Sequence, residues 1–150
     1  MTRILGLALI LALASPAVAQ ETASLTIRVE NVEPAGGVVR LGLYDESQYR
    51  LDRGAPAASA DVAATPGETT IVLKDLKPGT YAIEAFQDLN ANGKMDFTWV
   101  GLPEEPFGFS RDARPRFSKP DFARVVFTVA PGANAQTIAL QRGISLFGGR

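Results

Sequence analysis

The sequence predicts an all-β fold: a single antiparallel β-sandwich of about seven strands, immunoglobulin-like or transthyretin-like, with one long ordered loop. Three observations support this prediction. Short segments alternate apolar and polar residues, which is the two-residue period of a half-buried strand. Turn sequences rich in Pro and Gly separate these segments at short intervals. No long segment carries the apolar period of an amphipathic helix.

The first two predicted strands lie close together in the chain. In Ala23–Val32 every second residue from Leu25 onward is apolar, until the pattern ends near the turn sequence Pro34–Gly37. The next strand is Val38–Tyr44, which alternates in the same way. Because the connection is so short, we expect these two strands to pair antiparallel with each other.

The following segments are less uniform. Asp45–Pro56 is irregular, and we expect one helical turn there, with Tyr49 and Leu51 tucked under the edge of a sheet. Ala57–Ala64 is rich in small residues and is predicted to be an edge strand. The remaining predicted strands are Glu68–Leu73, Thr80–Phe86, Phe122–Val129 and Gln136–Leu140.

The N-terminal segment has the features of a secretory signal peptide over residues 1–19. A basic residue precedes the apolar run Ile4–Ala14, and Ala17–Ala19 offers a small-x-small cleavage site. We therefore expect export to the periplasm or the extracellular medium, with a β-sandwich domain over residues 20–142 and a flexible tail over residues 143–150.

The composition excludes several classes of chemistry. The chain has no Cys and no His, so it has no thiolate nucleophile, no histidine base and no Cys- or His-held metal. Any bound metal must be held by oxygen, which favours hard cations such as calcium. The net charge of −1 gives no long-range attraction to nucleic acid, and the mature chain has no second apolar run that could insert into a membrane.

A long stretch from Gln87 to Asp121 has no strand pattern but is rich in apolar residues. Such loops in compact domains tend to be functional. Its aromatic residues Trp99, Phe107 and Phe109 could form a platform that stacks on a sugar ring, or they could pack the loop onto the sandwich.

The loop begins with the segment Asp88–Asp96, which follows the spacing of a calcium-binding loop. Numbering from Asp88, oxygen-bearing side chains stand at positions one, three, five and nine, a glycine stands at six, and a backbone carbonyl is available at seven. Alternate residues of a tightly curled loop can point at one cation, and glycine permits the sharp bend. The candidate calcium ligands are Asp88, Asn90, Asn92, Lys94 through its carbonyl, Asp96, and Glu105 as a more distant carboxylate.

The segment also departs from the complete calcium loop. Position twelve, which carries a bidentate Glu in the complete motif, is Trp99, and a strand enters the loop in place of a helix. Asn and Gly are also good turn residues, so a metal-free hydrogen-bonded turn is the alternative to a calcium site. With two carboxylates, a calcium site would have a dissociation constant of about 10⁻⁴–10⁻³ M.

Four motifs occur in one order: Leu76-Lys77-Pro78-Gly79-Thr80-Tyr81-Ala82-Ile83, then Asp88–Asp96, then Gly101–Glu105, then Gly108-Phe109-Ser110. In this the chain resembles the bacterial family called domain of unknown function 2141, over essentially the whole mature sequence. It departs at Gln87, where members often have His, and at Pro106, where Gly is common. The resemblance implies an exported β-sandwich and supports the location of a site, and it implies no activity.

We therefore expect an exported, non-catalytic binding or structural module in which calcium orders the long loop. The first alternative is a carbohydrate-binding accessory protein that uses the loop aromatics. A third alternative is an enzyme with an acid–base pair drawn from Glu84, Glu104 and Glu105, and we do not expect one. The sequence identifies no partner, although a glycan or a protein is compatible with it.

Overall fold

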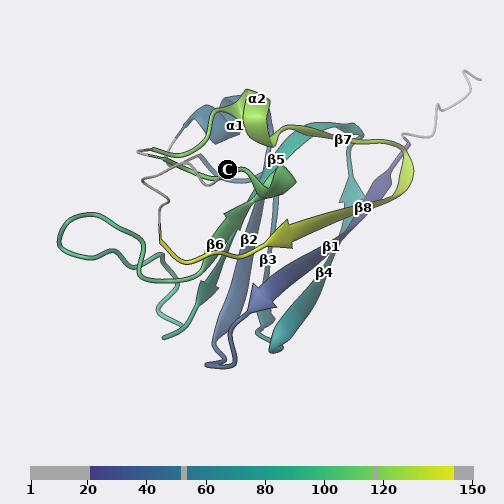
Figure 1. The fold of residues 1–150 in the computed structure, drawn as a ribbon. Coiled ribbons are helices and arrows are strands. Elements are labelled where there is room, and N and C mark those ends of the chain that lie inside the picture. Colours follow the sequence, from purple (N-terminus) through teal and green to yellow (C-terminus); the bar gives the residue numbers. More distant parts are fainter. Residues whose placement is uncertain (1–20, 52–53, 117, 144–150) are drawn as a thin grey trace, which may run out of the picture.

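The protein is a sandwich of two β-sheets with short helices at one end and a projecting loop at one side (Figure 1). The computed structural model describes residues 21–51, 54–116 and 118–143. The predicted signal peptide, residues 1–19, and residues 144–150 of the predicted tail lie outside this part of the chain. The all-β sandwich is confirmed, with eight strands in the described residues.

The smaller sheet has three strands in the order β4-β1-β8. The larger has the order β3-β2-β5-β6, and β7 pairs with the first part of β5. The strands are β1 (Ala23–Val32), β2 (Val38–Tyr44), β3 (Ala58–Ala63), β4 (Gly67–Leu76), β5 (Gly79–Asp88), β6 (Phe107–Phe109), β7 (Phe127–Val129) and β8 (Gly132–Ala139). The helices are α1 (Glu46–Arg50), the 3₁₀ turn η1 (Ser110–Asp112) and α2 (Phe122–Val125).

The main core lies between the two sheets and follows from the alternation in the sequence. Leu25, Ile27 and Val29 of β1 have no exposed surface, while their polar neighbours on the strand point outward. They meet the inward residues of β5, including Ile83, in one cluster of buried side chains. Burial of one such side chain stabilises the fold by roughly 1.5–3 kcal/mol, so this cluster is the main support of the sandwich.

The expected pairing of the first two strands is wrong. β1 pairs with β4 and β8, whereas β2 pairs with β3 and β5 in the other sheet. The connection therefore crosses from one sheet to the other. Two consecutive residues in the left-handed region make the turn, Gly36 (φ 82°) and Gly37 (φ 84°), and a Cβ on Gly37 would stand 2.2 Å from the carbonyl oxygen of Asp88.

Two further expectations need correction near the C-terminal end. Phe122–Val129 is not one strand, because Phe122–Val125 forms the helical turn α2 before β7 begins. The last strand starts earlier than expected, at Gly132, and it pairs with β1 in parallel, so one strand pair of the sandwich is not antiparallel.

A second cluster covers the outer face of the larger sheet. It contains Tyr49 of α1, Ala82 of β5 and Val125 of α2. As expected, Asp45–Pro56 contains one helical turn with Tyr49 buried, but Leu51 is 64% exposed. This cluster holds α1 and α2 on β5, and Figure 1 shows the two helices together at one end of the sandwich. None of the helices in the described part of the chain has the length and apolar character needed to cross a bilayer.

Candidate functional site

The acidic loop is anchored by the carboxylate of Asp88, the last residue of β5, which has no exposed surface. One oxygen, Oδ1, accepts the backbone N–H of Asn92 at 3.1 Å. The other, Oδ2, accepts the N–H of Gly93 at 2.8 Å and Nε of Arg40 at 2.7 Å. The first position of the loop therefore folds the chain back on itself and links it to β2.

These partners decide the ionisation of Asp88. Burial raises the pKa of its carboxyl, but the hydrogen bonds from Arg40, Gly93 and Asn92 together outweigh it and lower the pKa below 3.8. Asp88 is thus an anion in the interior at neutral pH, and its charge is compensated by a guanidinium that also contacts Asp61.

Three side chains of the loop converge on one point. Nδ2 of Asn90 donates to Oδ2 of Asp96 at 2.7 Å, and Nδ2 of Asn92 donates to the same oxygen at 2.8 Å. These are positions three, five and nine of the predicted calcium loop. The spacing in the sequence therefore brings the expected side chains together.

The backbone of the loop has the predicted bend. Gly93 at position six has φ 86°, and a Cβ there would meet open space, so the left-handed conformation is what calls for glycine. Ala91 is also left-handed, with φ 56°. The N–H of Lys94 donates to Oδ1 of Asn92 at 3.0 Å, so Lys94 is part of the same turn through its backbone.

Glu105, which the sequence suggested as a more distant calcium ligand, accepts hydrogen bonds from backbone amides of the loop. Its side chain is buried, and its two oxygens accept the N–H groups of Leu89 at 2.8 Å and Asp96 at 3.2 Å. The N–H of Glu104 also donates to the carbonyl of Asp96 at 3.0 Å. Glu105 therefore ties the start and the end of the loop together.

The carboxylates of this region do not meet at a common centre. In residues 21–51, 54–116 and 118–143, no three acidic side chains stand close enough together to hold a metal ion. A cation in the loop would depend on amide and carbonyl oxygens beside the carboxylates of Asp88 and Asp96.

Two residues of the site were not identified from the sequence. Arg40 lies 48 positions before Asp88 and reaches it only because β2 and β5 are neighbours. Gln87 is fully buried, and its amide accepts the N–H of Glu33 and donates to the carbonyls of Glu33 and Gly36. Gln87 thus fixes the crossing between the sheets directly beside the loop.

A cleft of about 410 Å³ opens beside the acidic loop, over β5 and β6. Its floor includes Phe86 and Phe107, and one wall is the continuation of the loop through Met95 and Phe97. Lys119 and Glu84, which form an ion pair at 3.2 Å, also line the cleft. The lining is mainly apolar, with this charged pair as its main polar feature.

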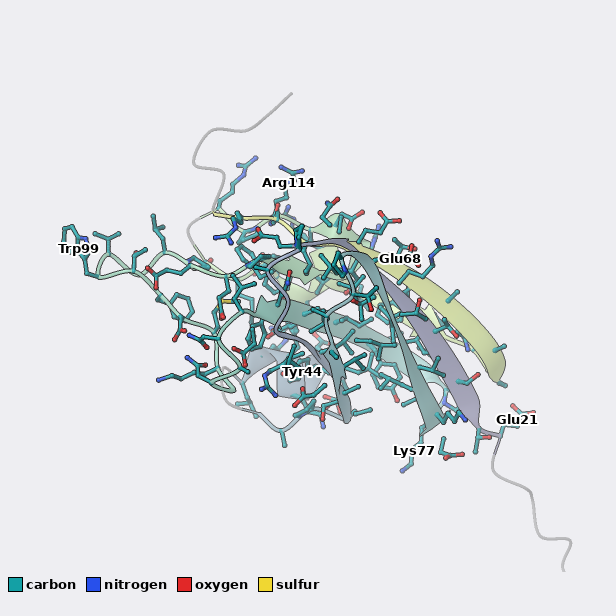
Figure 2. The ribbon with its side chains drawn as sticks, turned by 90° about the horizontal axis from the view of Figure 1, so that it is seen from below. Glu21, Tyr44, Glu68, Lys77, Trp99 and Arg114 are labelled. Atoms are coloured by element: carbon teal, nitrogen blue, oxygen red, sulfur yellow. The ribbon has the colours of Figure 1, made fainter. Side chains whose placement is uncertain are left out.

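The three predicted platform residues occupy different environments. Phe107 is buried and Phe109 partly buried, and their rings meet edge to face with centroids 6.1 Å apart. Both line the cleft, whereas Trp99 is 97% exposed at the end of the projecting loop (Figure 2). The aromatic side chains that join Phe107 and Phe109 at the cleft are Phe86 and Phe97, not Trp99.

The glutamates considered for acid–base chemistry are likewise in separate settings. Glu84 is paired with Lys119 in the cleft, and Glu105 is bound to backbone amides in the loop. Glu104 is exposed, and its carbonyl accepts Nη1 of Arg142 at 3.0 Å.

Comparison with known proteins gives one match. The model of a bacterial family described as "Uncharacterized protein conserved in bacteria (DUF2141)" matches residues 27–138, from β1 to β8, including the acidic loop and the cleft. No curated protein and no solved structure matches the chain. Since the match covers most of the sequence, the chain belongs to the DUF2141 family.

Proposed function

We propose that this protein is an exported, non-catalytic structural or binding module in which calcium bound by the Asp88–Asp96 loop fixes the long segment that follows. The observation that carries the proposal is the convergence of Asn90 and Asn92 on Oδ2 of Asp96. These residues come from alternate positions of a loop whose curl is set by Asp88. The same three side chains carry the oxygen atoms that would ligate one hard cation after the two amides turn.

Only the amide groups of Asn90 and Asn92 need to turn to give this loop the oxygen ligands of a calcium site. The two amide groups direct nitrogen at Asp96, and rotation of each by 180° about its last bond exchanges nitrogen for oxygen at nearly the same place. A cation at that point would then meet two amide oxygens and one carboxylate oxygen. Rotation gives up the hydrogen bonds that the Oδ1 atoms of Asn90 and Asn92 accept from backbone N–H groups, so calcium binding has a modest cost in loop hydrogen bonds.

Calcium would act on the rest of the molecule through Asp96. This residue is joined to Glu105 by its backbone N–H and to Glu104 by its carbonyl. The part of the cleft wall from Phe97 to Pro103 lies between these contacts. A cation on Asp96 therefore stabilises both ends of that wall, which suits a protein without disulfides.

A calcium titration followed by thermal unfolding tests the proposal. Wild type should gain stability between about 0.1 and about 10 mM calcium, because a ligand that binds only the folded state raises its stability. Asp96→Asn should lose most of this gain, while Asp61→Asn, which removes an exposed carboxylate outside the loop, should keep it. An unchanged melting temperature in wild type, or an equal gain in Asp96→Asn, would refute calcium binding at the loop.

The second candidate function is carbohydrate binding in the cleft. It is favoured by Phe97 and Phe109, aromatic side chains in the lining, next to the charged pair of Glu84 and Lys119. A glycan array with wild type and Phe97→Ala tests it. Binding that is lost in Phe97→Ala supports the assignment, and equal binding by both proteins rules out the cleft as the glycan site.

Export rests on the predicted signal peptide. N-terminal sequencing of the protein recovered outside the cytoplasm of its bacterial host should begin at Gln20. Recovery of full-length chain from the cytoplasmic fraction alone would contradict it.

A further inference from the structure

The wall of the cleft ends in a short hairpin that projects from the sandwich. Phe97 and Pro103 form an antiparallel bridge at its base, and the N–H of Thr98 donates to the carbonyl of Leu102 at 2.8 Å. Gly101, with φ 80°, makes the turn together with a bond from its N–H to Thr98. We call residues 97–103 the tip hairpin. In Figure 2 it extends away from the body of the molecule, with Trp99 at its end.

The tip hairpin concentrates the exposed apolar surface of the protein. Of the six large apolar side chains that are exposed in the described residues, four belong to it: Phe97 (57% exposed), Trp99 (97%), Val100 (55%) and Leu102 (38%). No charged residue occurs within the hairpin. Contiguous apolar surface of this kind marks a contact site, whereas scattered apolar residues do not.

The cleft of the same molecule has an apolar lining, as the tip hairpin has an apolar surface. The cleft of about 410 Å³ is lined mainly by apolar side chains, and Phe97 and Pro103 of the hairpin form part of its wall. Trp99, Val100 and Leu102 are not among its lining residues. The projecting end of the hairpin therefore does not line the cleft of its own molecule.

We propose that the cleft receives the tip hairpin of a second copy of this chain, in a two-fold dimer that exchanges the two tips. With the hairpins side by side and antiparallel, each Trp99 enters the cleft of the partner. The contact is isologous, so one arrangement fills both clefts and covers both tips. Glu84 and Ser118 in the lining offer acceptors for the indole N–H, which a buried Trp usually requires.

The small size of one tip hairpin favours a dimer in which both tips are buried over a contact in which only one tip enters a cleft. Four side chains on one hairpin make a small patch, and a stable protein interface covers about 800 Å² on each partner. Exchange adds the walls of the cleft to each side and doubles the number of buried tips. The uncharged hairpin brings no charge into the cleft, and the charge of Glu84 is already paired with Lys119.

The single Trp of the chain makes the exchange measurable without a label. Sedimentation velocity and Trp emission are recorded on wild type from about 1 µM to about 1 mM protein. We expect the mass to double and the emission to shift to the blue over the same concentration range, because Trp99 leaves water only in the dimer. Trp99→Ala removes the indole side chain from the end of the tip hairpin. Ser118→Arg places a charged side chain in the cleft. Each variant alone should stay monomeric.

A mixture of the two variants gives the sharpest outcome. The intact tip of Ser118→Arg fits the intact cleft of Trp99→Ala, so the mixture should form a weaker heterodimer although neither variant associates alone. Because Trp99 is exposed, its removal should leave the monomer folded, which circular dichroism checks. The proposal is overturned if wild type stays monomeric throughout, or if Trp99→Ala dimerises as wild type does. It is equally overturned if the emission shifts only on addition of phosphatidylcholine vesicles, which would assign the tip to a lipid surface.

Discussion

The guanidinium of Arg40 on β2 donates through Nε to the fully buried carboxylate of Asp88 at 2.7 Å, at the point where β5 becomes the acidic loop. The contact joins the sheet to the loop. It supplies the positive charge that lets Asp88 remain ionised in the interior while it accepts the N–H groups of Asn92 and Gly93. The conformation of the loop therefore depends on a strand residue far away in the sequence.

Removal of Arg40 should destabilise the protein. In Arg40→Ala the buried carboxylate of Asp88 loses its charged partner, and we expect a clear loss in the free energy of unfolding, measured by urea denaturation. The matched control is Arg28→Ala on β1, whose pair with Glu68 is exposed, so its loss should be clearly smaller. Equal losses in the two variants would show that the contact of Arg40 with Asp88 stabilises the protein no more than an exposed ion pair does.

Glu105 should control the opening of the acidic loop. Glu105→Ala removes the acceptor of the N–H groups of Leu89 and Asp96, so amide hydrogen exchange at these two residues should become faster. Glu105→Gln keeps one oxygen and should protect one of the two amides. Exchange in the core of β1 should be less affected, and unchanged protection of Leu89 and Asp96 in Glu105→Ala would contradict this role.

Gly108 should be intolerant of a side chain. A Cβ at this position of β6 would lie 2.8 Å from Cγ2 of Ile138 and 2.9 Å from the carbonyl oxygen of Ala139, where β8 approaches the larger sheet. We expect Gly108→Ala to cost about 1–3 kcal/mol, measured by urea denaturation, because the core must shift to admit one methyl group. Gly79→Ala is the control, since its nearest contact is an ordinary 3.4 Å and its stability should stay within about 1 kcal/mol of wild type.

The stability should fall in alkaline solution because of Tyr49. Burial and the nearby charges of Glu84 and Asp121 raise the pKa of its hydroxyl, which donates to the carbonyl of Pro120 at 2.8 Å. Below pH 10 the hydroxyl is neutral in both the folded and the unfolded chain. Above pH 10 the unfolded chain releases the proton while the folded protein retains it, so the free energy of unfolding decreases as pH rises.

Comparison of wild type with Tyr49→Phe at pH 9 and pH 11 isolates this contribution, because the other tyrosines titrate equally in both proteins. Unfolding by urea should show a smaller alkaline loss in the variant than in wild type. The same loss in both proteins would assign the alkaline effect to other groups.

The strands of this protein could be predicted from alternation, but their assignment to sheets could not. Ala23–Val32 and Val38–Tyr44 were located correctly, since each buries every second side chain. The turn between them looks like a hairpin in the sequence. It becomes a crossing because Gln87, far away in the chain, binds the backbone at Glu33 and Gly36.

The helical turn α2 has a weak signal in the sequence. Phe122 and Val125 are three positions apart and meet the same cluster, which is helical spacing, whereas a strand would separate them onto opposite faces. The parallel pairing of β8 left no signal of this kind, because strand direction is set by the path of the chain around the sandwich.

The contacts of the candidate site between residues close together in the sequence could be predicted. The spacing of Asn90, Asn92 and Asp96 brings these side chains together, and the bend at Gly93 follows the same pattern. Arg40 lay beyond such reasoning, since it depends on the register of β2 against β5. Trp99 was grouped with the cleft aromatics by proximity in sequence, but the tip hairpin carries it outward.

Calcium binding in the Asp88–Asp96 loop is tested by a crystal structure determined with calcium. We expect an anomalous peak about 2.3–2.6 Å from an oxygen of Asp96, with the amides of Asn90 and Asn92 turned so that oxygen faces the ion. An ordered loop at about 10 mM calcium with no peak, and with both amide nitrogens still donating to Asp96, would contradict it.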